Sequence, residues 1–526
     1  MRLTVPTPDD KPFEQVITNP AVLLEWLDQL PHIDQEGMLV EITESLSHLT
    51  RHPDKLLQLP QLLNCYQNTF DELYEQFLAN RSTSPDRPAG RKSRALLNRF
   101  LEMNRELGFG YNRLINEFSE TFEGPQLTDA ITRAMLTHER DILFAYESYH
   151  SITPIARQTL SQLFLFAESH YLAESTTEVS PVSATDILKR VLLLHLADPY
   201  SLPQQGIWAA HNYLIKHGPM ATLNTEPENG IMVDLQGNII PRTDAPIANR
   251  TIDSNRARYL DTRLLCEATR RYVSMAVQDA SKLPAAMRGV DRITALQMLR
   301  RWHRNWSTPP KRGATREEKY NRILTACGIE AVHHYLVQGT MLEKKQDDSS
   351  YDDEVILEGS DIYLASEHTE DFPIYEWQLF DISESGAGLI EDESDSTCFQ
   401  IGQLVLLAVH HIGDYRKPWM LGIIRRRLEE GMHKNEIGIQ FLPGNLHPLM
   451  IHPLISEASD PSDLSPAFLY DREDGSALLL TVRGLYKPNR AYTLQNDDQH
   501  KPVRAVTLIE STRYLDIFSF TTKEQD

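Results

Sequence analysis

The sequence predicts an α+β protein, in which a large N-terminal helical domain precedes a β-rich C-terminal part. From about residue 13 to residue 310, apolar side chains recur three and four positions apart, which is typical of amphipathic helices. After residue 400, short aliphatic and β-branched runs alternate with polar connectors, which is typical of a small barrel or sandwich. A chain of 526 residues is long enough for two to four domains.

The helical part begins at Asn19-Pro20, where an N-cap residue precedes proline at the first helical position. The predicted helices are 20–30, 56–77, 93–108, 111–122, 127–149, 154–171, 184–197, 204–216, 259–277 and 291–302. Polar loops are predicted at 80–91 and 175–183, and a short strand at 231–235. Helix–turn–helix pairs of this kind indicate a bundle or a short α-solenoid.

The end of the helical part is locally basic. Trp302 and Trp306 are interleaved with arginines between Arg288 and Arg316, a pattern compatible with a stacking platform for bases. We interpret it as an amphipathic helix that turns its tryptophans to the core and its arginines to solvent. His138 lies in a predicted helix, where a phosphotransfer histidine can occur, but nothing else in the sequence supports that role.

The β-rich part contains two groups of predicted strands. The first group is 323–336, 402–409, 419–425 and 436–442, and the second is 467–470, 477–482, 491–494, 503–511 and 516–521. The pattern leaves open whether the two groups form one β domain or two. His333-His334 falls on a predicted strand, and His410-His411 directly follows one. Adjacent side chains of a strand point to opposite faces, so we do not expect either pair to chelate a metal together.

Composition excludes several classes of protein. The formal net charge of −22 opposes binding to a nucleic acid polymer by phosphate neutralisation, although it leaves room for a local basic pocket. The four cysteines are far apart and show no CxxC pair, so we expect neither a zinc site nor a disulfide framework. The first residues lack an apolar signal core, and no apolar run approaches the roughly 20 residues of a membrane span. We therefore expect a cytoplasmic protein without a metal site, and no motif indicates catalysis.

The most informative stretch is the run Asp381-Ile-Ser-Glu-Ser-Gly386, a polar, glycine-containing turn between strands. The Asp381 carboxylate offers acceptors for paired donors such as the N1 and N2 edge of guanine, and Ser383 can donate or accept. Gly386 tolerates backbone angles that other residues avoid, and it lets another group approach the main chain. This turn is the candidate ligand site.

The turn and the strands after it resemble the PilZ domain, a six-stranded barrel family of bacterial cyclic-di-GMP receptors. The matching parts are Asp381-x-Ser383-x-x-Gly386, Ile401-Gly-Gln-Leu-Val, Leu421-Gly-Ile-Ile-Arg and Ile437-Gly-Ile-Gln-Phe. The resemblance implies a PilZ-like β-barrel with cyclic-di-GMP as ligand. It also implies a second half of the site, an Arg-x-x-x-Arg segment before the first strand, because planar guanidinium forks suit phosphate and the guanine Hoogsteen edge.

Arg312 and Arg316 match that second half in order along the chain. No arginine occurs between Arg322 and Arg416, so Lys311 and Arg322 are the additional candidates. An acidic insertion, residues 346–371, carries ten acids without a lysine or arginine and separates Arg316 from the turn. The open alternative for these arginines is a solvated basic linker.

We therefore divide the chain into a helical domain at 1–305, with a sub-boundary near 175–185, a PilZ-like barrel at 306–455 and a C-terminal β unit at 456–526. The expected function is a non-enzymatic cyclic-di-GMP receptor whose helical domain contacts an unknown protein partner. The alternative is an adaptor or structural protein whose PilZ-like barrel has lost the nucleotide.

Overall fold

The computed structural model describes most of the chain and divides it into two compact units, Met1–Arg312 and Gly313–Asp526, which are treated separately below. The described residues are 2–9, 16–31, 34–81, 91–226, 230–235, 256–290, 292–308, 317–338, 372–391, 399–408, 419–430, 434–454, 464–496 and 499–522.

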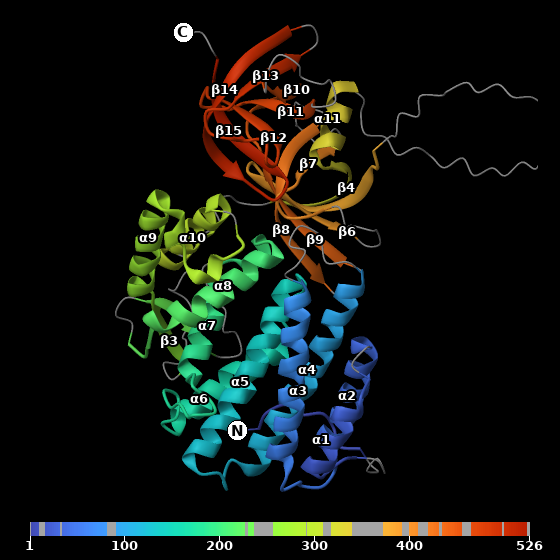
Figure 1. The fold of residues 1–526 in the computed structure, drawn as a ribbon, viewed down its shortest axis with the longest axis vertical. Helices are drawn as coiled ribbons and strands as arrows, with labels where there is room; N and C mark the ends of the chain where they lie inside the picture. Colours follow the sequence, from blue (N-terminus) through green and yellow to red (C-terminus); the bar gives the residue numbers. More distant parts are fainter. Residues whose placement is uncertain are drawn as a thin grey trace, which may run out of the picture. The chain divides into compact units, whose positions relative to one another are not determined.

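The first unit is helical, as the sequence predicts (Figure 1). Its α-helices are α1 Pro20–Gln29, α2 Gln35–Thr50, α3 Leu59–Arg81, α4 Arg91–Phe118, α5 Gly124–Glu147, α6 Pro154–Ser169, α7 Ala184–Leu196, α8 Gln204–His217, α9 Arg263–Gln278 and α10 Arg292–Ser307. Single 3-10 turns lie at η1 Pro199–Ser201, η2 Gly218–Met220, η4 Ala280–Lys282 and η5 Ala285–Met287. A small antiparallel sheet joins β1 Thr222–Asn224, β3 Ala257–Asp261 and β2 Ile231–Asp234 in that order.

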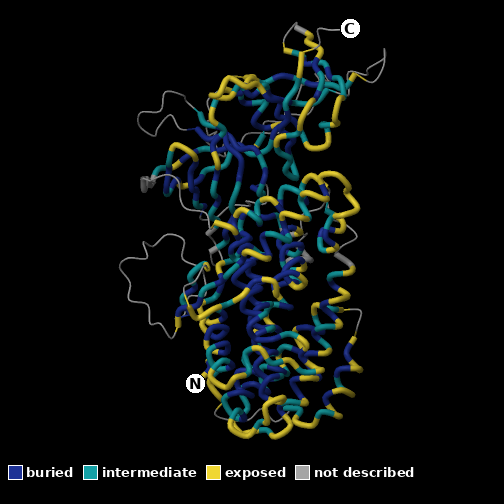
Figure 2. Tube along the Cα trace, turned by 90° about the vertical axis from the view of Figure 1, so that its left-hand side faces the viewer, coloured by how far each residue is buried: buried dark blue, intermediate teal, exposed yellow. Residues whose placement is uncertain are grey.

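Local signals in the sequence set the starts of several helices. The side chain of Asn19 accepts a hydrogen bond from the Ala21 amide, with proline at the first position of α1. Ser183 caps α7 in the same way through the amide of Asp186. These contacts satisfy backbone amides that an N-terminal turn leaves without a partner. Figure 2 shows buried and exposed stretches alternating along the helices of this unit.

Three helix predictions are wrong. Segments 93–108 and 111–122 form one helix, α4, because Gly108 and Gly110 serve packing rather than termination. A Cβ at Gly110 would lie 2.5 Å from Leu63 Cδ2 of α3, so glycine there permits close helix–helix approach. Helix α9 begins at Arg263 instead of 259, because Tyr259 pairs with Asn224 and Met232 inside the small sheet.

The tryptophans of the basic segment lie in the core, as predicted. Trp302 and Trp306 are fully buried, and the Trp306 indole donates a hydrogen bond to the Leu193 carbonyl at 2.9 Å. Arg304 on the same helix is exposed. The interpretation of this stretch as an amphipathic helix is therefore confirmed for the described part of α10.

The described residues of the second unit form two closed β-barrels and one helix. The strands are β4 Glu317–Cys327, β5 Tyr375–Ser383, β6 Gly386–Glu391, β7 Leu404–Ala408, β8 Trp419–Glu430, β9 Lys434–Phe441, β10 Asn445–Pro453, β11 Ser465–Asp471, β12 Ala477–Val482, β13 Ala491–Asn496, β14 Gln499–Ser511 and β15 Leu515–Thr522. The first barrel has the order β4-β5-β6-β9-β8-β7, and the second has the order β10-β11-β12-β15-β14-β13. Strand for strand along the chain, the two barrels have the same antiparallel topology.

This answers the question that the sequence left open, because the C-terminal strands close a barrel of their own. Strand β10 lies inside the range 306–455 that the sequence assigned to the first barrel, yet it pairs with β11 and β13 of the second. The pairing of β8 with β9 extends to Glu429 and Asn435, which pair directly. The sequence predicted a polar connector there, between the strands 419–425 and 436–442.

The predicted strand 323–336 is correct only over residues 323–327. Strand β4 ends at Cys327, and Gly328 with φ +99° turns the chain into helix α11 Ile329–Gln338. Ile329, Val332 and Tyr335 are buried and recur at helical spacing. The prediction of a strand over this run did not take that spacing into account. His333 therefore lies on a helix, where its ring nitrogen Nε2 is 3.1 Å from the carbonyl oxygen of Leu449.

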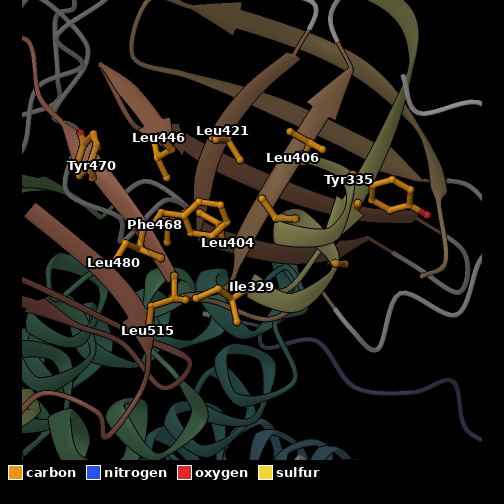
Figure 3. Close-up of a cluster of buried hydrophobic side chains, with 14 of the residues drawn as sticks. Ile329, Tyr335, Leu404, Leu406, Leu421, Leu446, Phe468, Tyr470, Leu480 and Leu515 are labelled. Carbon is orange, nitrogen blue, oxygen red and sulfur yellow. The ribbon is translucent and has the colours of Figure 1, made fainter. Parts of the chain in front are cut away.

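A shared apolar core joins the two barrels and α11 (Figure 3). Leu404, Leu406 and Leu421 from the outer face of the first barrel meet Phe468 and Leu480 from the second. A separate cluster, which includes Trp377, Leu379 and Ile439, fills the interior of the first barrel. The second barrel thus covers the β7–β8 side of the first barrel through an apolar interface.

Candidate functional site

The Asp381–Gly386 motif lies on the hairpin that joins β5 and β6. Ser383 pairs with Gly386, so only Glu384 and Ser385 form the tip of the turn. The Ser383 hydroxyl donates a hydrogen bond to the Gly386 carbonyl at 3.2 Å, and the Phe441 amide of β9 donates to the Ser385 carbonyl at 3.0 Å. The prediction of a polar turn between strands is confirmed, with Asp381 placed on β5 rather than in the turn itself.

A β-bulge decides which way Asp381 points. Trp377 and Leu379 face the barrel interior, so strict alternation along β5 would also turn Asp381 inward. The register shifts between Leu379 and Asp381, and Ile382 becomes the next interior residue. The bulge therefore brings Asp381 to the outer face of the barrel, where it is 8% exposed.

Two glycines of β6 make this arrangement possible in different ways. A Cβ at Gly386 would overlap the carbonyl oxygen of Ile439, so this glycine permits close approach of β6 and β9. Its φ angle is not in the left-handed region, so the expected need for unusual backbone angles plays no part. A Cβ at Gly388 would overlap the Phe380 ring and lie 2.7 Å from Asp381 Oδ1. Gly388 thus provides the space that the Asp381 carboxylate and the Phe380 ring fill.

Sequence reasoning overlooked Phe380 and Gly388. Gly388 follows the motif by two positions, which places it on the same face of β6 as Gly386. That spacing was a usable signal for Gly388. Phe380 had no such signal, because alternation along β5 without a bulge places it on the opposite face from Asp381.

The arginine half of the predicted site is described only in part. Lys311, Arg312 and Arg316 lie outside the described residues. Arg322 lies on β4 with its side chain 86% exposed, and its guanidinium is 3.0 Å from the Glu376 carboxylate on β5. Asp381 pairs with Glu318 on that strand, four residues before Arg322.

The turn is connected to the second barrel through side chains. Gln440 of β9 pairs with Gly386, and its side-chain oxygen accepts a hydrogen bond from Arg425 Nε at 2.8 Å. Arg425 also forms a bidentate ion pair with Glu510 of β14. This chain of contacts ties the strand behind the turn to a residue of the other barrel.

The helical unit holds a buried ionic group that does not resemble a reaction centre. Burial by itself would raise the pKa of Glu139, but Arg190 and His211 lower it to about 2. Burial lowers the pKa of neighbouring His138 to about 4, and its Nε2 lies 3.2 Å from Asn112 Oδ1. A buried, neutral imidazole of this kind is poorly placed to accept a phosphoryl group.

Clusters of metal ligands and membrane-spanning helices are absent from the described ranges. No group of three or more His, Cys, Asp or Glu side chains there is arranged to hold a metal ion. Among the described helices, none is both long and apolar enough to cross a membrane.

Two protein-family models match the chain. Residues 361–450 match the PilZ domain, which covers β5 to β9 and most of β10. Residues 21–228 match a family described as the N-terminal domain of the cyclic-di-GMP receptor FimW, which covers α1 to β1. No curated protein matches the chain significantly.

The comparisons confirm the PilZ resemblance and add a match that the sequence analysis did not anticipate. The PilZ match begins at residue 361, so it includes the Asp381–Gly386 hairpin and excludes Lys311, Arg312, Arg316 and Arg322. The helical unit also matches a domain of a cyclic-di-GMP receptor. With these two matches in separate parts of one chain, the protein is a cyclic-di-GMP receptor.

Proposed function

We propose that cyclic-di-GMP binds on the outer face of the first barrel, at the β5–β6 hairpin, and that binding is relayed to the helical unit. The observation that carries the site is the placement of Asp381. A bulge turns its carboxylate outward, and Gly388 leaves room for it. A carboxylate in that position accepts hydrogen bonds from the N1 and N2 donors of a guanine, while Ser383 at the turn offers a further polar contact.

The ligand is a dianion, so the proposed site also needs cations. We assign this role to Arg312 and Arg316, with Lys311 as an additional contact, because the PilZ resemblance implies such a pair before the first barrel strand. Arg322 fits less well, since its side chain points to solvent and is paired with Glu376. On this proposal the protein binds its ligand without transforming it.

Calorimetric titration of cyclic-di-GMP into the full chain tests the site. Asp381→Asn, Arg312→Ala and Arg316→Ala should each weaken binding by about 1.5–3 kcal/mol, which is the usual contribution of a hydrogen bond to a charged group. Arg322→Ala is the matched control and should bind like the wild type. Absence of binding to the wild-type chain would reject the site and favour an adaptor with a non-binding barrel.

Coupling to the helical unit has its own test. Ligand can shift the protein between two arrangements only through its different affinity for them. Amide hydrogen exchange with and without cyclic-di-GMP should therefore change in helices of residues 20–307 as well as in the hairpin. Protection confined to the barrels would contradict the relay while leaving the binding site intact. A changed helical surface is where we expect a protein partner to bind.

A further inference from the structure

The ligand face of the first barrel extends beyond the motif hairpin, across β6 and β9 to β8. Asp381 pairs with Gly388, Gly388 pairs with Gly438, and Gly438 pairs with Arg426. These four residues form one row across four strands. Three intervals of about 4.8 Å separate its ends, so the row spans about 14 Å between the backbones of β5 and β8.

Side chains lean over this row from both ends. From β5, the Phe380 ring and the Asp381 carboxylate lie over Gly388. From β8, the stem of Arg426 lies over Gly438, because a Cβ at Gly438 would be 3.2 Å from Arg426 Cβ and 4.0 Å from its Cδ. The two glycines between them add no side chain of their own, so the Asp381 and Arg426 side chains lie over neighbouring glycines of the same row.

A second bulge puts Arg426 on this face. Ile424 pairs with Ile439 and faces the barrel interior, and the register of β8 then shifts before Arg426. Arg427 pairs with Ile437 and is buried, while Arg426 is 44% exposed. The row is thus bounded by two bulges, one on β5 and one on β8, and bulges commonly re-aim side chains beside binding sites.

We propose that Arg426 is a further ligand-binding residue, whose guanidinium binds a phosphate of cyclic-di-GMP while Asp381 holds a guanine at the other end of the row. This inference rests on the proposed function, because it takes the ligand and the role of Asp381 from it. The apolar interface with the second barrel involves β7 and the first half of β8, on residues such as Leu406, Leu421 and Ile423. The strip at Gly388 and Gly438 lies on the neighbouring strands.

The ion pair of Arg426 is compatible with this role. Its guanidinium lies 3.9 Å from Glu436 on β9, at the outer limit of an ion pair. A ligand phosphate would offer a fork-shaped guanidinium two parallel hydrogen bonds, which a carboxylate at that distance does not supply. Glu436 then competes with the ligand rather than supporting the site.

The test is a calorimetric titration of cyclic-di-GMP into the full chain and its variants. Arg426→Ala should bind about 10- to 100-fold more weakly, and Arg426→Lys should lie between it and the wild type, because it keeps the charge and loses the fork. Glu436→Gln should bind at least as tightly as the wild type. Arg472→Ala is the matched control, since the Arg472 side chain has nearly the same exposed fraction, 43%, and is also ion-paired, with Asp474. It lies on the β11–β12 hairpin, the counterpart in the second barrel of the β5–β6 hairpin.

The outcomes separate this inference from the proposed function. If the wild type binds and Arg426→Ala binds equally well, the role of Arg426 is wrong and the receptor site stands. If the wild type does not bind, both are wrong. If Glu436→Gln weakens binding as much as Arg426→Ala, the ion pair acts only on the fold of β8 and β9, and the proposal is again overturned. Thermal unfolding of each variant without ligand, compared with that of Arg472→Ala, controls for loss of structure.

Discussion

Substitution of Gly388 by alanine should separate ligand binding from folding. A Cβ at this position would overlap the Phe380 ring and lie 2.7 Å from Asp381 Oδ1, closer than such carbon atoms approach an oxygen. Both neighbours are the outer ends of side chains rather than backbone atoms, so they can move without parting the strands. We expect Gly388→Ala to displace the Asp381 carboxylate while the barrel stays closed.

The magnitude follows from the contact that is lost. A hydrogen bond to a charged group contributes about 1.5–3 kcal/mol, so loss of the Asp381 contact should weaken cyclic-di-GMP binding by about 10- to 150-fold. The cost to stability should stay near 1 kcal/mol, at the lower end of the range for an added methyl group in a packed site. Calorimetric titration gives the affinity, and urea unfolding without ligand gives the stability.

Gly386→Ala is the matched comparison on the same strand. Its Cβ would overlap the carbonyl oxygen of Ile439, which is backbone and cannot rotate away. Strands β6 and β9 must separate locally, so this variant should lose more stability than Gly388→Ala. The reasoning would be refuted if Gly388→Ala binds like the wild type while remaining folded, or if the two variants are equally destabilised.

Two further predictions concern buried charge. Burial raises the pKa of Glu391 in the first barrel to about 7 despite the opposing effect of Arg427, so the folded state holds this proton more tightly than the unfolded state does. The stability that this group contributes is complete below pH 4.5 and is lost as pH rises through 7, by up to about 3 kcal/mol. Glu391→Gln should therefore flatten the pH dependence of urea-unfolding stability between pH 5 and 8. An unchanged pH profile would contradict the assignment. In the helical unit, Arg190→Met leaves the buried Glu139 carboxylate without its ion-pair partner and should lower the free energy of unfolding by about 3–5 kcal/mol. Arg271→Met, at an exposed pair, should lower it by under about 1 kcal/mol. Equal losses in urea unfolding would count against a buried ion pair.

Much of the local structure could be predicted from the sequence. Asn19-Pro20 starts α1, and the strand predicted at 477–482 coincides with β12, because caps, helical periodicity and alternation depend on residues close together in the chain. The errors arose where a residue's role depends on a distant neighbour. Gly110 resembles a helix break in the sequence, but in the structure it provides the space that Leu63 of α3 occupies.

The candidate site shows the same division. The motif itself could be found in the sequence, since Asp381, Ser383 and Gly386 lie within one hairpin and their types suit a guanine. The outward direction of Asp381 could not be found, because it depends on a bulge that shifts alternation by one residue. The sequence could not indicate Arg426 as a site residue at all. It joins the proposed site only through the register of β5, β6, β9 and β8 together.

By itself, the sequence determined that helices precede strands, that a PilZ-like hairpin lies at Asp381–Gly386, and that its chemistry suits cyclic-di-GMP. Only the tertiary structure decided that the strands close two barrels of the same order, and which side chains share the proposed ligand face. The physical reason is the range of the interactions. Turns, caps and alternation are set within a few residues, whereas barrel closure and cross-strand rows depend on hydrogen-bond registers between segments far apart in the chain.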